Sequence, residues 1–176
     1  MKKFYFLLVT FVVLLLNSCV YENDDYFIND YNQGEIGLNG MFLPAYEADL
    51  YLLETYPDNS KLYSLIVTEN YTINGTVYSN VALETEIYKP YNTSLEGIYY
   101  LNSAYRSIDF VQYYRNATIT NGVVSSANFV IPSNTFSYGE LRLDYIGNNR
   151  YHVDMYFETY NAQIVESTFE GVFYSY

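Results

Sequence analysis

An all-β fold is what residues 37–176 predict, in the form of an antiparallel β-sandwich of about eight to ten short strands. Apolar side chains recur at every second position in one segment after another, and no long segment follows the helical period. The chain also holds 24 tyrosines and 11 phenylalanines, which are residue types that favour strands. A closed β-barrel is the alternative, because its strands alternate in the same way.

The first strands are expected at residues 45–56 and 61–73, joined by the turn Pro57-Asp58-Asn59-Ser60. A third strand, residues 76–89, shows the clearest alternation and ends at Pro90. Its core-facing side chains are expected to be Val77, Ser79, Val81, Leu83, Thr85 and Ile87. Its solvent-facing side chains are expected to be Tyr78, Asn80, Ala82, Glu84, Glu86 and Tyr88.

The middle of the chain predicts four shorter strands, at residues 95–101, 107–115, 117–120 and 124–132. Asn116 separates the second of these from the third. Asn121-Gly122 is a strong signal for a two-residue hairpin turn between the third and the fourth.

Residues 139–176 predict three strands joined by two tight turns, at residues 147–149 and 160–162. A slip of one residue would turn a strand's apolar side chains to the wrong face, so the apolar pattern determines the register. The register that keeps the apolar faces together pairs Leu143 with Val153, Leu141 with Met155, Phe157 with Val165, and Val153 with Phe169.

The same register places the chain's one histidine, His152, between Asp144 and Glu170 on the solvent-facing side. An imidazole and two carboxylates are possible ligands for a divalent metal, or a base with its orienting groups. The simpler interpretation is a row of solvated cross-strand pairs, and it is favoured because an outward sheet face is flat and wet. The chain contains no phosphate-binding loop, zinc-protease motif or serine-hydrolase motif. We therefore expect no cofactor and no catalysis.

Charge and tyrosine content limit the class of partner. Without Lys2 and Lys3 the chain has 6 basic residues against 20 acidic ones, a formal charge of −14. Such a chain repels nucleic acid, so we expect no nucleic-acid partner.

Tyrosine offers a flat contact surface with a polar tip. Tyr78, Tyr88 and Tyr156 are candidates for an aromatic surface that binds a glycan or a protein.

The amino-terminal segment begins with Lys2 and Lys3 and continues with a thirteen-residue run, 4–16, that is apolar except at Thr10. This run is shorter than the roughly 20 residues of a membrane-spanning helix and fits the apolar part of a secretory signal. It ends in Leu16-Asn17-Ser18-Cys19, which resembles the lipobox of bacterial lipoproteins. The resemblance implies that residues 1–18 are a signal peptide and that acylated Cys19 attaches the protein to a membrane. The alternative is an uncleaved signal anchor with a chance cysteine.

Residues 19–36 are expected to be a flexible acidic tether, with carboxylates at Glu22, Asp24, Asp25, Asp30 and Glu35. This stretch resembles the acidic export signal of surface lipoproteins from Bacteroidetes-type bacteria, which implies display on the outer face of the outer membrane. The alternative is a plain spacer in the periplasm. Residues 95–176 also resemble the strand pattern at the end of small lipoproteins from such bacteria, which implies a fold and a location but no activity.

Together these observations predict a lipid-anchored protein of the cell envelope, displayed on the surface as a non-catalytic binding module for a glycan or a protein. One alternative is a lipocalin-like β-barrel that carries a small apolar ligand, which requires a hollow interior. A small hydrolase and a subunit that holds a larger envelope complex are the others.

Overall fold

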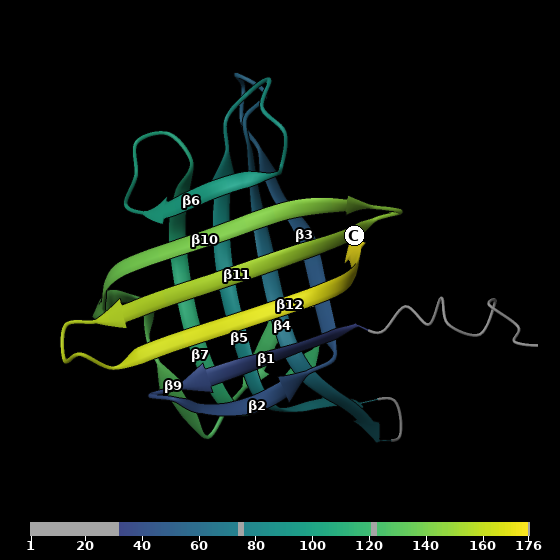
Figure 1. Ribbon diagram of the computed structural model, residues 1–176, viewed down its shortest axis with the longest axis vertical. Helices are drawn as coiled ribbons and strands as arrows, with labels where there is room; N and C mark the ends of the chain where they lie inside the picture. Colours follow the sequence, from purple (N-terminus) through teal and green to yellow (C-terminus); the bar gives the residue numbers. More distant parts are fainter. Residues whose placement is uncertain (1–31, 74–75, 121–122, 176) are drawn as a thin grey trace, which may run out of the picture. The chain divides into compact units, whose positions relative to one another are not determined.

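The structure is a computed structural model that describes residues 32–73, 76–120 and 123–175. Its twelve strands belong to one sheet (Figure 1). Eight strands form a closed ring: β3 (Glu47–Thr55), β4 (Lys61–Ile73), β5 (Thr76–Lys89), β6 (Gly97–Leu101), β7 (Ser107–Thr120), β10 (Phe136–Gly147), β11 (Arg150–Thr159) and β12 (Ile164–Ser175). Four lie outside it: β1 (Gln33–Leu38), β2 (Met41–Ala45), β8 (Val123–Ser126) and β9 (Phe129–Ile131). A short 3-10 helix, η2 (Ser133–Thr135), precedes β10.

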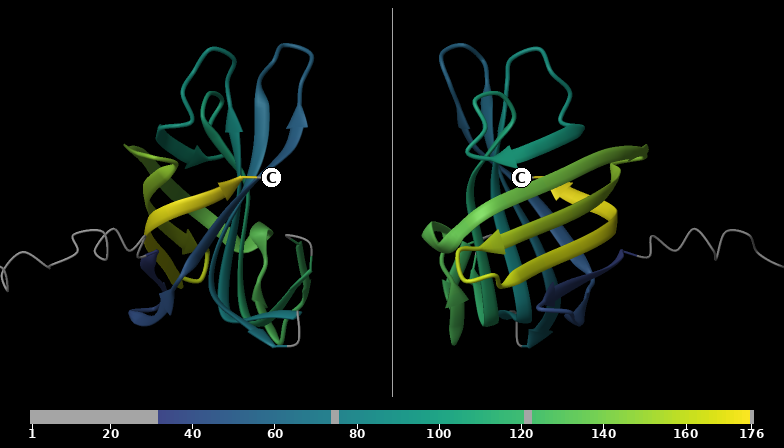
Figure 2. Two further views of the ribbon diagram at one scale, coloured as in Figure 1. Left: turned by 90° about the vertical axis from the view of Figure 1, so that its right-hand side faces the viewer. Right: turned by 60° about the vertical axis from the view of Figure 1, so that its left-hand side comes forward.

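Two short parallel pairings close the ring, and the other pairings are antiparallel. At one corner β6 pairs with β7 through Tyr100–Ser107 and Leu101–Ile108. At the other corner residues 173–175 of β12 pair with residues 48–50 of β3. Between these corners lie two layers, with β6, β10, β11, β12, β1 and β2 in front of β3, β4, β5 and β7 (Figures 1 and 2).

The expected all-β class is therefore confirmed, whereas the expected sandwich is wrong. The fold is a closed barrel, as in the alternative interpretation of the strand pattern. The two architectures differ only at the corners, where a few residue pairs join the layers. Those pairs leave the alternation of apolar residues unchanged, so the pattern could not distinguish the two folds.

Side chains fill the interior of the barrel. The largest fully buried ones come from both layers: Tyr99, Tyr113, Phe157, Phe169, Ile36, Leu65, Ile66, Leu83, Ile87, Ile108, Leu141 and Leu143. All of these except Ile66 belong to one continuous core cluster. Burying a side chain of Leu or Phe size contributes about 1.5–3 kcal/mol, so this cluster is the main source of stability. An eight-stranded barrel is just wide enough for such filling.

The predicted register of the last three strands is confirmed. Leu143 pairs with Val153, Leu141 with Met155, Phe157 with Val165, and Val153 with Phe169. The first turn has positive φ at Gly147 (98°), Asn148 (54°) and Asn149 (58°). Glycine and asparagine are the residues that adopt this conformation most readily, which explains their presence there.

The alternation in residues 76–89 is also confirmed on the core side, where Val81, Leu83, Thr85 and Ile87 are buried. Ala82 is a correction, because this expected solvent-facing residue is buried in a small second cluster with Tyr114 and Ala117. Residues 107–120 form one strand, β7, with Asn116 at a positive φ of 49° inside it. The predicted Asn121-Gly122 turn lies outside the described residues, and β7 and β8 on either side of it pair antiparallel.

The folded part of the chain begins earlier than residue 37. Residues 33–36 belong to β1, which pairs with β12 on one side and β2 on the other. Asn39 and Gly40 join β1 to β2 with positive φ angles of 52° and 77°, as a tight two-residue hairpin requires. The predicted signal peptide, Cys19 and the predicted acidic tether up to residue 31 lie outside the described residues.

Candidate functional site

A groove of about 470 Å³ runs along the outer face of β10 and β11. It is lined by Tyr138, Glu140, Arg142, Asp154, Met155 and Tyr156. Strand alternation explains the lining, because Leu141 and Leu143 point into the core and turn Glu140 and Arg142 outward. Tyr156, one of the three tyrosines predicted to bind a ligand, thus belongs to a groove.

Two tyrosine rings form the aromatic end of this groove. Tyr138 and Tyr156 lie edge to face, with ring centroids 6.1 Å apart. The Tyr138 hydroxyl donates to Glu140 Oε2 at 3.1 Å, and this bond raises the pKa of Tyr138. Tyr138 is 46% exposed, so its ring is available to a ligand. Tyr100 of β6 is paired with Glu140 across the strands and is exposed as well.

Ion pairs continue the groove along the same face. Arg142 Nε lies 2.7 Å from Asp144 Oδ2, and His152 Nε2 lies 3.2 Å from Asp154 Oδ2. These side chains therefore present oriented donors and acceptors beside the tyrosines. Such groups can bind hydroxyl groups of a ligand while the rings contact its apolar parts.

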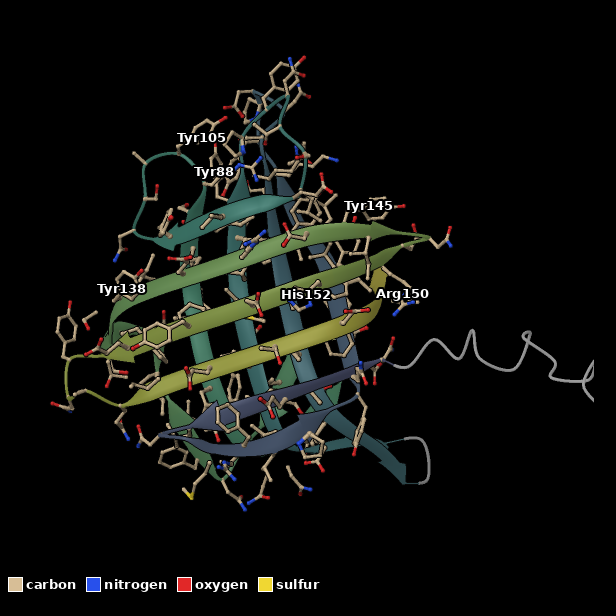
Figure 3. The ribbon with its side chains drawn as sticks, viewed as in Figure 1. Tyr88, Tyr105, Tyr138, Tyr145, Arg150 and His152 are labelled. Carbon is tan, nitrogen blue, oxygen red and sulfur yellow. The ribbon has the colours of Figure 1, made fainter. Side chains whose placement is uncertain are left out.

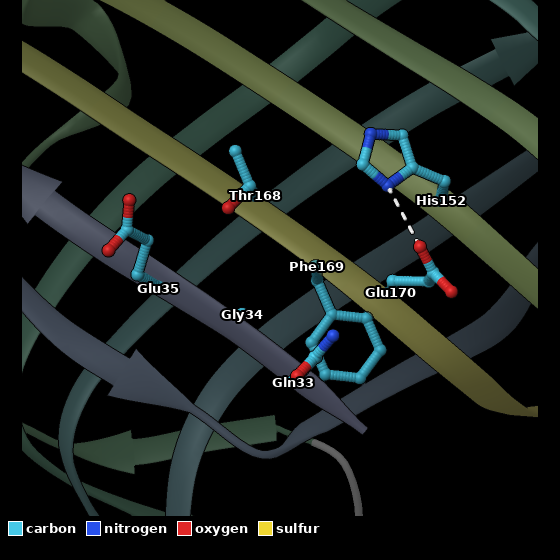
Figure 4. A pocket seen from close by; sticks show the side chains of 7 residues that line it. All are labelled: Gln33, Gly34, Glu35, His152, Thr168, Phe169 and Glu170. Carbon is cyan, nitrogen blue, oxygen red and sulfur yellow. Dashed lines mark ion pairs between the residues drawn. The ribbon is translucent and has the colours of Figure 1, made fainter. Parts of the chain in front are cut away.

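A second groove, of about 350 Å³, crosses β11, β12 and β1. Figure 4 shows its lining, which is Gln33, Gly34, Glu35, His152, Thr168, Phe169 and Glu170. His152 Nδ1 lies 3.9 Å from Glu170 Oε2, and Arg150 Nη2 lies 3.2 Å from Glu170 Oε1. Because His152 lines this groove and bonds to Asp154 of the first, the two grooves adjoin along β11.

The predicted row of metal ligands is present in the backbone, but only its His152–Glu170 half is present in the side chains. Asp144 is paired with His152, and His152 with Glu170, as the register predicted. Asp144, however, turns to Arg142, while His152 contacts Asp154 through Nε2 and faces Glu170 with Nδ1. Within the described ranges, no group of three or more His, Cys, Asp or Glu side chains is arranged to hold a metal ion.

Tyr88 and Tyr156 lie on different layers of the barrel and do not form one surface. Tyr88 lies at the end of β5, where its ring is 5.9 Å from that of Tyr56 (Figure 3). Tyr78 pairs through its backbone with Tyr71 and Thr118, and its side chain is not among those described. Sequence reasoning missed Tyr138 and Tyr100. The predicted pairing of Leu141 with Met155 implies that Glu140 and Tyr156 are neighbours on the outer face. The register alone could therefore have indicated part of the groove lining.

The packed interior bears on the carrier alternative. A carrier needs internal space for its ligand, whereas the side chains that point into this barrel are fully buried against one another. Both grooves described above lie on the outside of the barrel instead.

The described segments include no helix of the length and apolar character needed to cross a membrane.

Comparisons with known proteins add no assignment to this geometry. No protein-family model matches the chain, and neither the curated proteins nor the solved structures gave a match.

Proposed function

We propose that this protein is a non-catalytic glycan-binding module of the cell envelope, anchored by lipid on Cys19 and displayed on the cell surface. The barrel binds the glycan along the two adjoining grooves on the outer face of β10, β11, β12 and β1. The observation that carries the proposal is the Tyr138–Tyr156 ring pair beside Glu140, Arg142 and Asp154 in the larger groove.

Sugars have apolar C–H faces and polar hydroxyl edges, and the groove offers a partner for each. The tyrosine rings provide flat apolar contact, while the carboxylates and the guanidinium provide acceptors and donors. The groove volumes, about 470 and 350 Å³, fall within the range typical of small-ligand sites. Two adjoining grooves along one strand suit a chain of several sugar units.

Binding can be tested with the full-length chain purified in mild detergent. A panel of neutral and charged glycans identifies the best ligand, and calorimetric titration then gives its affinity. Tyr156→Ala and Tyr138→Ala should each weaken binding about tenfold, because a buried aromatic contact in a binding site typically contributes 1 kcal/mol or more. Tyr160→Ala is the matched control, because Tyr160 is 77% exposed and lies in the turn after β11.

The proposal fails if no glycan on the panel binds. It also fails if both groove variants bind the best ligand as tightly as the unchanged chain does.

Anchoring has its own test. In a bacterial host that acylates lipoproteins, the unchanged chain should incorporate labelled palmitate and partition into a detergent phase. Cys19→Ala should do neither, because Cys19 is the chain's one cysteine. Membrane retention of this variant would instead support an uncleaved signal anchor. Cleavage of the unchanged chain by protease added to intact cells would test surface display.

A further inference from the structure

A second polar site lies on the opposite wall of the barrel, on the outer face of β3, β4 and β5 (Figure 2). Asp49 is paired with Ile66, and Ile66 with Glu84, so these three side chains form one row across the face. Ser64 and Thr68 stand two residues on either side of Ile66 in β4, and they therefore point the same way. Ile66 is thus a buried apolar floor with four polar residues around it.

Three polar atoms around this floor have no hydrogen-bond partner. Ser64 and Thr68 are only 3% and 2% exposed, and the Ser64 Oγ and Thr68 Oγ1 atoms are both unpaired. The Tyr51 hydroxyl bonds to the Asp49 carboxylate, yet Asp49 Oδ1 is buried and unpaired. Buried polar groups are nearly always hydrogen-bonded, so these unpaired atoms point to a partner that completes them. Ser64 and Thr68 are four residues apart in β4, about 13 Å along the strand, so one ligand group can reach only one of the two hydroxyls together with Asp49.

The charge around the floor is negative. Glu84 and Glu86 lie on β5, opposite Ile66 and Ser64. Burial and the neighbouring Glu47 raise the pKa of Asp49 to about 6, and burial and Glu84 raise the pKa of Glu86. Both arginine ion pairs in the described part of the chain, Arg142–Asp144 and Arg150–Glu170, lie on the front layer instead. Asp49, Glu84 and Glu86 are partly exposed and form the accessible rim of the site.

We propose that this face binds an organic cation, namely an alkylammonium or guanidinium group. Its N–H groups donate to Asp49 Oδ1 and Ser64 Oγ, which can both accept and which lie on neighbouring strands. Glu84 and Glu86 offset its charge, and its methylene groups lie against Ile66. A cation that carries N–H donors fits better than a metal ion, because no three described carboxylate, His or Cys side chains are arranged for one. The group can belong to a free polyamine or to a lysine or arginine side chain of a partner protein.

The test titrates the full-length chain with a matched pair of probes, 1,6-diaminohexane and 1,6-hexanediol. The diamine should bind and the diol should not, because the two share a length but only the diamine is charged. Asp49→Asn should weaken diamine binding at least tenfold, and Ser64→Ala should weaken it severalfold. Glu166→Gln, which removes one carboxylate from β12 on the front layer, should change it less than twofold.

A second measurement does not depend on any variant. The diamine should shift the NMR resonance of the Ile66 δ-methyl group, and the diol should leave it in place. A tri-lysine peptide separates the two sources: tighter binding than the diamine assigns the site to a protein partner, and weaker binding assigns it to a free amine. Three results would overturn the proposal. The diol could bind as tightly as the diamine, Glu166→Gln could weaken binding as much as Asp49→Asn does, or the Ile66 resonance could stay unmoved by the diamine.

Discussion

Asp49 shows how one residue's surroundings change its chemistry. It belongs to β3, where burial and the charge of Glu47 raise the pKa of its carboxyl group from 3.8 to about 6. The folded protein therefore binds the Asp49 proton more tightly than the unfolded chain does. Its contribution to stability is complete below pH 3.8 and is lost as the pH rises through 6.

Asp49→Asn should consequently stabilise the protein at pH 8 and have little effect at pH 4. Asparagine keeps the shape of the side chain but cannot ionise, so the variant avoids placing a charge in this partly buried position. After allowance for solvent screening, the gain at pH 8 should be on the order of 1 kcal/mol. Urea unfolding at both pH values measures it. An equal effect at pH 4 and pH 8 would show that ionisation of Asp49 is not the cause.

His152 marks the limit of sequence reasoning at the residue scale. The apolar pattern predicted its cross-strand neighbours, Asp144 and Glu170, and the backbone register confirms both. The pattern contained no information on side-chain rotamers, however. His152 Nε2 bonds to Asp154, two residues along its own strand and on the same face, while Nδ1 lies 3.9 Å from the predicted partner Glu170 and Asp144 turns away to Arg142. The three predicted side chains are therefore not gathered around one point where a metal ion could bind.

At the scale of elements, the β1–β2 hairpin is the part of the sheet whose attachment depends on close backbone approach. A Cβ atom added at Gly34 would lie 2.2 Å from the Thr168 carbonyl oxygen and 2.8 Å from Phe169 Cα. Both neighbours are backbone atoms of β12 and cannot rotate away. The absence of a side chain at Gly34 therefore allows β1 to pair with β12.

Gly34→Ala should loosen this hairpin more than it disturbs the closed ring. Overpacking of this kind typically costs about 1–3 kcal/mol. Hydrogen exchange should accelerate in residues 33–45 and change less in β4, β5 and β7, because the ring closes without β1 and β2. Gly37→Ala is the control, since a Cβ there meets the ring of Phe42, a side chain that can turn aside. Equal acceleration in every strand would contradict this account.

The strands that the sequence predicted best are those with one buried and one wet face. Residues 139–176 meet this condition, and their register followed from the apolar pattern. The first turn is one residue shorter than predicted, because Gly147 pairs with Arg150 after a register shift at Tyr145. β1 was not predicted as a strand, because its sequence, Gln-Gly-Glu-Ile-Gly-Leu, has two glycines and only two large apolar residues. The acidic residues before it led us to predict one continuous tether up to residue 36, although Ile36 is fully buried.

At the scale of the whole molecule, the two parallel corners turn two layers into a barrel. Each corner involves only two or three residue pairs, contributed by segments far apart in the chain. A local pattern contains no trace of such long-range pairings, so the sequence allowed both a sandwich and a barrel. The position of Tyr100 opposite Glu140 was beyond sequence reasoning for a similar reason, because it depends on the pairing of β6 with β10.

Phe173 tests how much the corner between β12 and β3 contributes to the stability of the barrel. It is paired with Ala48 in β3 and is buried against two rings, Tyr151 at 5.0 Å and Phe169 at 5.8 Å between centroids. Phe173→Ala should destabilise the protein by about 3–5 kcal/mol, because it removes a buried ring and leaves a cavity. The exposed Tyr160→Ala should change stability by less than about 0.5 kcal/mol.

Urea unfolding and hydrogen exchange separate the two ways in which this loss could arise. If the corner belongs to the cooperative core, Phe173→Ala should lower the unfolding midpoint and accelerate exchange throughout the ring. If the corner opens independently, exchange should accelerate only near residues 48–50 and 173–175, with the midpoint almost unchanged. We expect the first result, because Phe173 belongs to the same core cluster as Leu65, Tyr113 and Leu141 on the other strands. The second result would mean that the barrel opens at this corner without unfolding.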